Sequence, residues 1–218
     1  MSLRINDTIP NLQVSTDHGD FLLHDFIGEN WAILFSHPKD FTPVCTTEFG
    51  AVAQLEHEWA QRNTKVIGIS VDSVDDHQKW KLDIEKVGGA KANFPIIADD
   101  FLHVSKAFDM LPAEAYLPDG RTPNDSATVR SVFIIGPDKK LKLSMTYPMS
   151  VGRNFSEVLR ALDALQTTSK LGVATPADWQ VGDDIVIPVA VNDDDARAKF
   201  GQFQALTPYL RKAKLPAQ

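Results

Sequence analysis

The sequence predicts an α/β protein in which strands of a central mixed sheet are flanked by helices and followed by a small α+β extension. Two patterns carry this prediction. Short apolar strand-like runs alternate with helix-like segments up to about residue 168, and the composition changes beyond Thr167. A 24.1 kDa chain can bury a substantial core, and 43% hydrophobic with 23% charged residues are ordinary globular values. We therefore assign residues 1–168 to a main domain and residues 169–218 to the extension.

The first strand is expected at residues 31–36, an apolar run that leads into a polar segment containing the only cysteine. A helix is expected over residues 46–62. Its apolar residues recur at a spacing nearer 3.6 than 2: Phe49, Val52, Leu55 and Trp59. The next strand is expected at residues 65–71, a short apolar run rich in branched side chains.

A second helix is expected after residues 72–73, either of which has a side chain that can cap it, and it should stop at the glycine pair 88–89. Its apolar residues are Trp80, Ile84 and Val87. Residues 94–98 form a further short strand candidate. Two strand-like runs, residues 129–135 and 141–147, flank a cluster of turn residues, which predicts a hairpin.

The next helix is expected to be capped by Asn154, with Glu157 three residues later. Its apolar stripe consists of Phe155, Val158, Leu159, Leu162 and Leu165. In the extension we expect a loop at residues 175–179, a strand at 184–191 and a short helix opened by residues 192–195. Three acids at this helix start suit the helix dipole, and the spacing of a calcium loop is absent.

The net charge of −7 argues against a broad nucleic-acid face or an anionic membrane surface. No stretch approaches the roughly 18 apolar residues of a membrane span, and residues 1–7 lack the apolar core of a secretory signal. A single cysteine excludes an internal disulfide and fits a reducing compartment. We therefore expect a cytoplasmic protein with no nucleic-acid or membrane partner.

Cys45 lies where the first strand meets the first helix. A thiol at a helix start faces outward N–H groups and the positive end of the helix dipole, which favours the thiolate. A cysteine taken at random is more often a small buried apolar residue. Here, however, Thr42 stands where thioredoxin-like redox proteins have the first cysteine of Cys-x-x-Cys. A hydroxyl can hydrogen-bond a thiolate or a bound oxygen but cannot form a disulfide, which favours a one-cysteine reaction.

Arg130 is the second unusual residue. Strand alternation places it on the same face as Val132 and Ile134, where a guanidinium needs an anionic partner. A thiolate, a carboxylate elsewhere in the chain and solvent at the strand end all remain open as its partner.

The pattern Pro38-x-x-x-Thr42-x-x-Cys45 matches the active-site signature of peroxiredoxins. Residues 36–48 and 136–143 resemble the one-cysteine, peroxiredoxin-6-type branch, and residues 175–179 are similar to the start of its C-terminal extension. The resemblance spans essentially the whole chain. It implies a thioredoxin-like core, a C-terminal domain and a peroxidase, free of metal or other cofactor, that reduces hydrogen peroxide and organic hydroperoxides.

Carried over by position, the resemblance implies that Cys45 is the peroxidatic nucleophile. Thr42 would hold the peroxide and the thiolate, Arg130 would stabilise both, and Pro38 would shield the sulfur from water. Supporting roles would fall to His37, Glu48 (which would orient the arginine) and Arg153. Each of these three also has an ordinary explanation: a solvated histidine, an acid in the first helical turn and a surface arginine.

Ionisation alone cannot explain a specialised peroxidase. A free thiol is about 3% ionised at pH 7, so complete ionisation gains at most roughly 30-fold. The larger effect should be stabilisation of charge on the departing oxygen. The product would be the sulfenic acid of Cys45, and no second cysteine can capture it. We therefore expect an external thiol, glutathione or another small thiol, to reduce it, directly or through a partner protein. We also expect a homodimer, with larger assemblies left open.

Other functions remain to be weighed. The branch's reported phospholipase motif is not carried over, because Asn30 stands at its serine position and an amide is no acyl-transfer nucleophile. A Cys45–His37 hydrolase lacks an evident orienting group, and six scattered histidines show no paired metal-ligand spacing. The alternative to an enzyme is a redox sensor or holdase switched by Cys45 oxidation.

Overall fold

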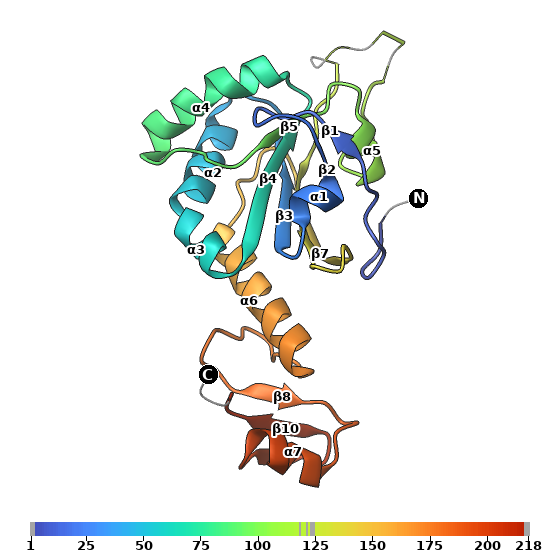
Figure 1. The fold of residues 1–218 in the computed structure, drawn as a ribbon, viewed down its shortest axis with the longest axis vertical. Coiled ribbons are helices and arrows are strands. Elements are labelled where there is room, and N and C mark those ends of the chain that lie inside the picture. The colour runs from blue at the N-terminus through green and yellow to red at the C-terminus, as the bar shows by residue number, and fades with distance from the viewer. Residues whose placement is uncertain (1–2, 118, 121, 123–124, 216–218) are drawn as a thin grey trace. The chain divides into compact units, whose positions relative to one another are not determined.

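A five-stranded mixed sheet forms the centre of the main part of the chain (Figure 1). The computed structural model describes residues 3–117, 119–120, 122 and 125–215. The strand order is β5-β4-β3-β6-β7, with β5, β4 and β3 parallel to one another and β6 and β7 added antiparallel. The strands are β3 (Trp31–Ser36), β4 (Thr64–Ser70), β5 (Ile96–Ala98), β6 (Arg130–Ile135) and β7 (Leu141–Tyr147).

Helices cover both faces of this sheet, as expected for the fold class (Figure 1). One face carries α2 (Pro43–Gln54), α3 (Glu56–Gln61) and α4 (Val74–Gly88). The other carries α1 (Leu23–Ile27), α5 (His103–Ala107) and a hairpin of β1 (Gln13–Val14) and β2 (Phe21–Leu22). The sequence signals did not predict α1, α5 or this hairpin, which are all short.

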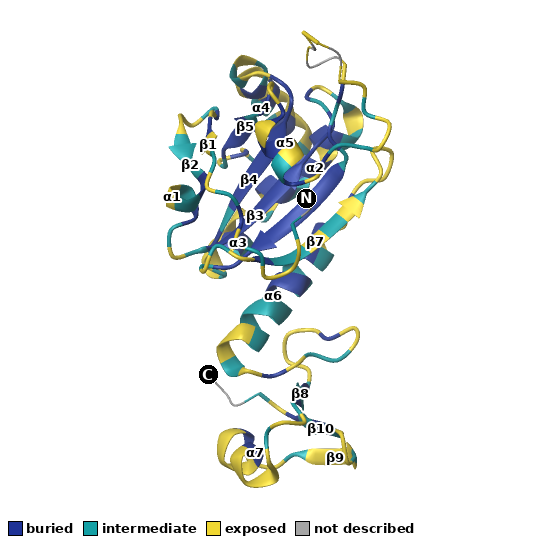
Figure 2. Cartoon of the chain, turned by 90° about the vertical axis from the view of Figure 1, so that its right-hand side faces the viewer, coloured by how far each residue is buried: buried dark blue, intermediate teal, exposed yellow. Residues whose placement is uncertain are grey.

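The inner strands β3 and β6 are buried along their whole length, whereas the edge strand β7 is partly exposed (Figure 2). In β3, Ala32 and Leu34 join the core cluster beneath α1 and α5, while Phe35 faces the opposite side and meets Phe49 of α2. In β6 the same alternation sends Phe133 to the first cluster. Arg130 therefore lies on the face that α2 covers, as strand alternation predicted.

The expected helix over residues 46–62 is wrong in two respects. The helix begins earlier, at Pro43, because proline has no N–H to lose at the first helical position. It also breaks at Leu55, which separates α2 from α3. In α4, Ser73 caps the start by accepting from the Asp76 N–H. Val87 was expected on the apolar side of α4, but it is 60% exposed.

The chain divides into two compact units, one ending at Arg153 and one beginning at Asn154. The second unit begins with α6 (Phe155–Leu171), capped by the Asn154 side chain. The boundary predicted after residue 168 falls in the last turn of α6 and remains a prediction. A three-stranded antiparallel sheet, β8-β10-β9, follows with one helix. These elements are β8 (Ile185–Ile187), α7 (Asp193–Phe200), β9 (Gln204–Thr207) and β10 (Leu210–Ala213).

Among the described residues, the longest helices are too short or too polar to cross a membrane.

Candidate active site

Cys45 lies in the first turn of α2, and its side chain is fully buried. Thr42 is the extended N-cap residue and Pro43 begins the helix, so the first helical bond runs from the Thr46 N–H to the Thr42 carbonyl. The N–H groups of Val44 and Cys45 precede that bond and have no partner within the helix. They are available to a group bound beside the sulfur.

Arg130 approaches this sulfur from β6. Its Nη1 donates to Cys45 Sγ at 3.3 Å, and its Nε donates to the Met149 carbonyl at 2.8 Å. The side chain of Arg130 is almost completely buried. The structure therefore brings Arg130 to the thiol, which was one of the partners left open from the sequence.

The carboxylate of Glu48 lies between two arginines. Arg130 Nη1 donates to Glu48 Oε2 at 2.7 Å, and Arg153 donates to both carboxylate oxygens at 2.9 and 2.7 Å. Burial alone would raise the pKa of Glu48, but the hydrogen bonds and charge of Arg153, with the charge of Arg130, lower it below its usual value. Two arginines and one carboxylate leave one positive charge, which a Cys45 thiolate would balance.

Arg153 is not a surface residue, since only 8% of it is exposed. Its Nη1 donates to the carbonyls of Ser36 in β3 and Ser131 in β6, at 2.7 and 3.0 Å. This guanidinium therefore ties the ends of two strands to Glu48 of α2. It sets where Glu48 lies, and Glu48 in turn contacts Arg130.

The hydroxyl of Thr42 donates to the Lys39 carbonyl at 2.9 Å. This bond uses the hydroxyl hydrogen of Thr42. The hydroxyl oxygen can still accept a hydrogen bond from a hydroxyl group of a bound ligand. Pro38 is buried at the end of β3 and begins the loop that leads to Thr42. The Cys45 site and this loop thus share one short stretch of chain.

His37 is fully buried and is not a solvated histidine. Its Nε2 lies 2.6 Å from Asp40 Oδ1, and its ring stacks on Trp80 with centroids 4.9 Å apart. Burial lowers the pKa of His37. The other oxygen of Asp40 lies 2.6 Å from His77 Nδ1.

Of this cluster of buried polar side chains, the sequence indicated only His37 as a candidate. The position of Asp40 inside the Pro38-x-x-x-Thr42-x-x-Cys45 pattern could have pointed to it. Nothing in the spacing of the sequence connects Asp40 to His77 or to Asp72. Donor atoms of His37, Asp40 and Asp72 all lie within 4.8 Å of one another, which is compact enough for a metal ion. Hydrogen bonds within the protein already use both Asp40 oxygens and Oδ2 of Asp72.

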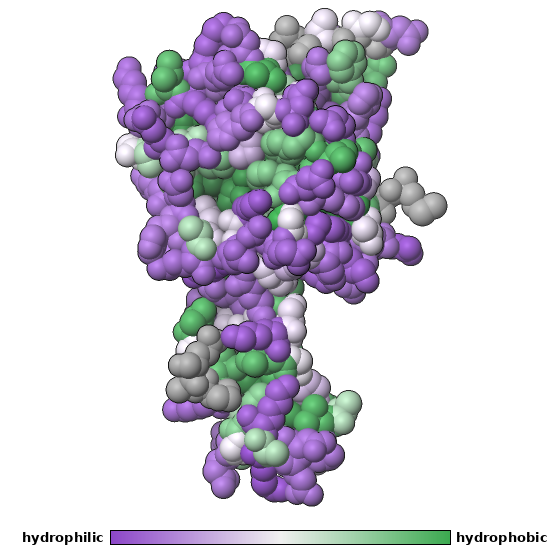
Figure 3. Space-filling view, in the orientation of Figure 1, coloured by the Kyte–Doolittle hydropathy of each residue, from purple (hydrophilic) through white to green (hydrophobic). Residues whose placement is uncertain are grey.

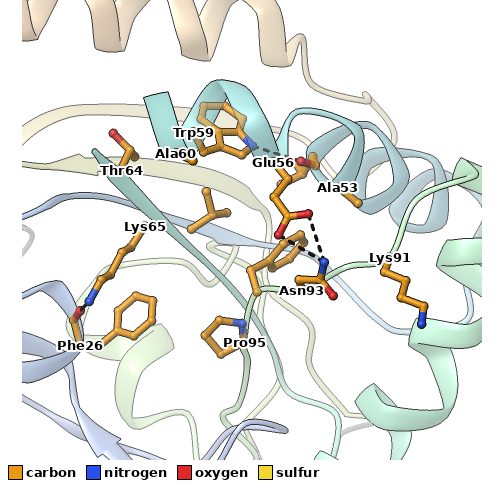
Figure 4. A pocket seen from close by; sticks show the side chains of 13 residues that line it. Phe26, Ala53, Glu56, Trp59, Ala60, Thr64, Lys65, Lys91, Asn93 and Pro95 are labelled. Atoms are coloured by element: carbon orange, nitrogen blue, oxygen red, sulfur yellow. Dashed lines mark hydrogen bonds between the residues drawn. The ribbon is translucent and has the colours of Figure 1, made fainter. Parts of the chain in front are cut away.

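An apolar hollow of about 240 Å³ lies elsewhere on the main unit (Figures 3 and 4). It is formed by the end of α2, by α3, by β4 and by residues 91–95. Trp59, Val66 and Pro95 contribute to its walls, and Glu56 accepts from Asn93 at its rim (Figure 4). The residues gathered around Cys45 are not among those that line it.

The chain has a mixed sheet and a lone cysteine at a helix start, and an arginine contacts that cysteine. These features define a thioredoxin-like thiol oxidoreductase. Comparison with known families identifies the family within this class. Residues 5–144 match the AhpC/TSA family, and residues 164–202 match the C-terminal domain of 1-Cys peroxiredoxin. The chain belongs to the AhpC/TSA family and to its one-cysteine peroxiredoxin branch. It is a thiol-dependent peroxidase, as the sequence resemblance implied.

Relatives and solved structures agree with this assignment. The mitochondrial peroxiredoxin PRX1 of Saccharomyces cerevisiae is 51% identical, with 97% of this chain and 81% of the relative covered. The 1-Cys peroxiredoxin A of Oryza sativa is 48% identical, with 92% and 90% covered. A structure of a mutant peroxiredoxin 6 of Arenicola marina has a TM-score of 0.92 and 41% identity, with both chains fully covered.

A yeast mitochondrial 1-Cys peroxiredoxin, whose structure was solved to explain thiol resolution by the glutathione and thioredoxin systems, has a TM-score of 0.88. It is 49% identical, with 98% of this chain and all of that chain covered. The expectation of a cytoplasmic location is wrong, because the relative that is 51% identical is a mitochondrial protein. An unpaired cysteine fits any reducing compartment and does not distinguish between them.

Proposed function

We propose that Cys45 is the peroxidatic nucleophile of this peroxidase. The observation that supports this most directly is the 3.3 Å contact between Arg130 Nη1 and Cys45 Sγ at the first turn of α2. The thiolate attacks one peroxide oxygen, so that an S–O bond forms as the O–O bond breaks and sulfur is oxidised to sulfenic acid. The departing oxygen leaves as hydroxide or alkoxide and takes a proton from water, giving water or an alcohol.

Arg130 has two functions in this step. Its positive charge stabilises the thiolate before attack, and it then stabilises the negative charge on the departing oxygen. The N–H groups of Val44 and Cys45 point the same way from the helix start. The Thr42 oxygen accepts a hydrogen bond from the peroxide hydroxyl, because its own O–H already donates to the Lys39 carbonyl.

Glu48 and Arg153 support the reaction by fixing Arg130. Pro38 limits the access of water to the sulfur from the loop before α2. His37 supports the same loop through Asp40, and it is not assigned a contact with the peroxide. These three roles rest on position, burial and hydrogen bonding.

The substrate class includes organic hydroperoxides. A hollow of about 480 Å³ lies beside Thr42 and has apolar walls from Phe41, Pro43 and Val87. The side chain of Phe41 is 52% exposed, so it offers apolar surface to an organic group. Such a group can lie in this hollow while its peroxide oxygens reach Thr42.

An external thiol completes the cycle. The thiol attacks the Cys45 sulfenic acid and releases water, and a second thiol then reduces the mixed disulfide and restores Cys45. Cys45 is the chain's only cysteine, so both thiols must come from other molecules. Glutathione is our candidate for the first thiol, because a relative's structure concerns resolution by the glutathione and thioredoxin systems.

We further propose a homodimer formed through β7. In the part of the chain that the structure describes, β7 pairs with β6 on one side and with no strand on the other. Leu141 at its start exchanges backbone hydrogen bonds with residues 6 and 7, and the rest of this edge, residues 142–147, is a template for pairing with a second copy. The mass of the protein in dilute solution tests this, and a monomer would contradict it.

Two further assignments are kept as proposals. We propose a mitochondrial location, since a relative with 51% identity is mitochondrial; fractionation of cells that express the tagged protein tests it. We also propose that the C-terminal extension begins at residue 169. Limited proteolysis that leaves a stable fragment ending near that residue would support this boundary.

The enzyme assay compares wild type with Cys45→Ser. Consumption of hydrogen peroxide and of an alkyl hydroperoxide is followed with glutathione or a dithiol as donor. We expect wild type to turn over with at least one donor and the variant to be inactive. Mass spectrometry after one equivalent of peroxide should find one added oxygen on Cys45, and an active Cys45→Ser protein would overturn the assignment.

A further inference from the structure

A buried histidine–carboxylate–histidine chain lies behind the loop that precedes α2. One carboxylate oxygen of Asp40 is hydrogen-bonded to His37 Nε2 and the other to His77 Nδ1, each at 2.6 Å. The second nitrogen of His77 lies 3.1 Å from the Ile97 carbonyl in β5. These three polar side chains are at most 3% exposed.

The number of protons in this chain of contacts can be counted. The Ile97 carbonyl can only accept, so His77 Nε2 must carry a proton. An ionised Asp40 can only accept, so His77 Nδ1 and His37 Nε2 must each carry one. The contacts need three ring protons, whereas two neutral imidazoles supply two. One extra proton therefore belongs to the chain.

That proton has two possible positions. It lies either on His77, which then forms an imidazolium, or on Asp40 as a neutral carboxyl. Burial favours the neutral acid, but the hydrogen bonds from His37 and His77 outweigh it and lower the pKa of Asp40 to about 2. This favours an ionised Asp40 and a doubly protonated His77. His37 is then neutral, and its buried Nδ1 has no hydrogen-bond partner.

We propose that His77 is held as a buried imidazolium and acts as the positioning residue for the peroxidatic loop. The proposal rests on the proposed function of Cys45. Through Asp40, His77 connects α4 to the loop at residues 37–42, which carries Pro38 and ends at the N-cap of the Cys45 helix. Through Ile97 it connects that loop to β5.

The charges around His77 explain why the extra proton stays. The titratable groups of this network are Asp40 and His37 on the loop and Asp72 just after β4. Asp72 accepts from the Asp40 N–H at 2.9 Å and from the Ser70 hydroxyl at 2.7 Å. A neutral His77 would place an unprotonated ring nitrogen against either the Asp40 carboxylate or the Ile97 carbonyl, and two acceptors facing each other in a buried place are costly.

The protonation state is tested on the reduced wild-type protein with ¹⁵N-labelled histidine. NMR correlation of ring protons with ring nitrogens should show both His77 nitrogens protonated between about pH 6 and 8, where a free histidine loses its charge. His77→Gln identifies the signals by their loss. An unprotonated His77 nitrogen in this range would overturn the proposal, and so would an extra proton found on Asp40.

The positioning role is tested with two variants that keep one donor each. The amide of His77→Asn can replace the donor to Asp40, and that of His77→Gln can replace the donor to Ile97, but neither carries charge. We expect both to lower the rate constant of Cys45 with peroxide about tenfold or more, because the loop is displaced. The Cys45 thiolate fraction should change less than the rate.

The control is His57→Gln on α3, an exposed site outside the cluster, which should react like wild type. A variant that fails to fold is replaced by Asp40→Asn, in which the proposal expects His77 to lose its second proton in the NMR spectrum. Wild-type rates in both His77 variants, with Cys45→Ser inactive, would sink this inference and leave the proposed function intact. An active Cys45→Ser protein would instead remove the proposed function.

Discussion

One nitrogen of Arg130, Nη1, donates to Glu48 Oε2 at 2.7 Å and also reaches the sulfur of Cys45. The position of the guanidinium beside the sulfur is therefore set by a carboxylate on the same helix as the cysteine. Arg153 also donates to both oxygens of that carboxylate, so Glu48 links the two arginines to the helix that carries the cysteine. The catalytic geometry thus depends on Glu48 as much as on the Arg130 guanidinium and the Cys45 sulfur.

Replacing Arg130 should affect chemistry more than ionisation. We expect Arg130→Ala to lower the second-order rate constant with hydrogen peroxide by about 100-fold or more, because charge on the departing oxygen loses its donor. Loss of thiolate alone cannot exceed roughly 30-fold at pH 7. The measurement is the rate across pH beside the thiolate fraction from ultraviolet absorbance. Equal losses of rate constant and of thiolate fraction would show that Arg130 acts on ionisation only.

Glu48→Gln should reduce both stability and rate. The substitution leaves two buried arginines without their counter-charge, and breaking such a pair costs about 3 kcal/mol of unfolding free energy. The control is Glu157→Gln, whose pair with Arg160 is partly exposed to solvent and should cost less than about 1 kcal/mol. Urea unfolding of both variants checks this, and similar losses would contradict it.

The stability of the protein should fall in acid partly because of Asp40. Its pKa is about 2 in the folded chain and 3.8 ordinarily, so folding stabilises the ionised form. This contribution is complete above the ordinary value and is lost as the pH falls through about 2. Between pH 5 and pH 3, this carboxyl alone should take about 1 kcal/mol from the unfolding free energy of wild type. NMR titration of the Asp40 carboxyl carbon checks the shift, and a carboxyl half-protonated near pH 3.8 in the folded protein would contradict it.

Gly88→Ala should destabilise the contact between α2 and α4. A Cβ at residue 88 would lie 2.5 Å from the Cα of Gly50, which is backbone and cannot swing aside. We expect a loss of about 1–3 kcal/mol in unfolding free energy, as for other overpacked sites. Gly152→Ala is the control, because its nearest neighbour would lie at an ordinary 3.6 Å. No difference between the two variants would mean that the helices separate at little cost.

Elements with a strong local signal were predicted well from the sequence. The apolar run of β3 and a polar cap before α4 are local features that the sequence shows directly, and the structure selects Ser73 over Asp72 as the cap. The break at Leu55 has no glycine or proline to mark it, and the apolar spacing continues across it into α3. Strands as short as β9 and β10 depend on pairing with each other and on the small core of their unit, which local patterns do not encode.

The site was predicted unevenly for the same reason. Strand alternation found Arg130, because a charge on an apolar face is visible in one segment. The expected helix start nominated Cys45, and comparison with Cys-x-x-Cys nominated Thr42. The contact between Asp40 and His77 joins residues 37 positions apart, and no period in the sequence relates them. Such a contact becomes visible only when the β3–α2 loop and α4 are placed side by side.

Trp80 gives the protein an optical reporter of its own chemistry. Its indole stacks on His37 and donates at 3.0 Å to the hydroxyl of Thr46, the residue directly after Cys45. Any displacement of that helical turn when the sulfur gains or loses an oxygen must alter the surroundings of the indole. Ultraviolet emission recorded after rapid mixing can therefore time each half of the cycle in the natural chain, with no dye attached.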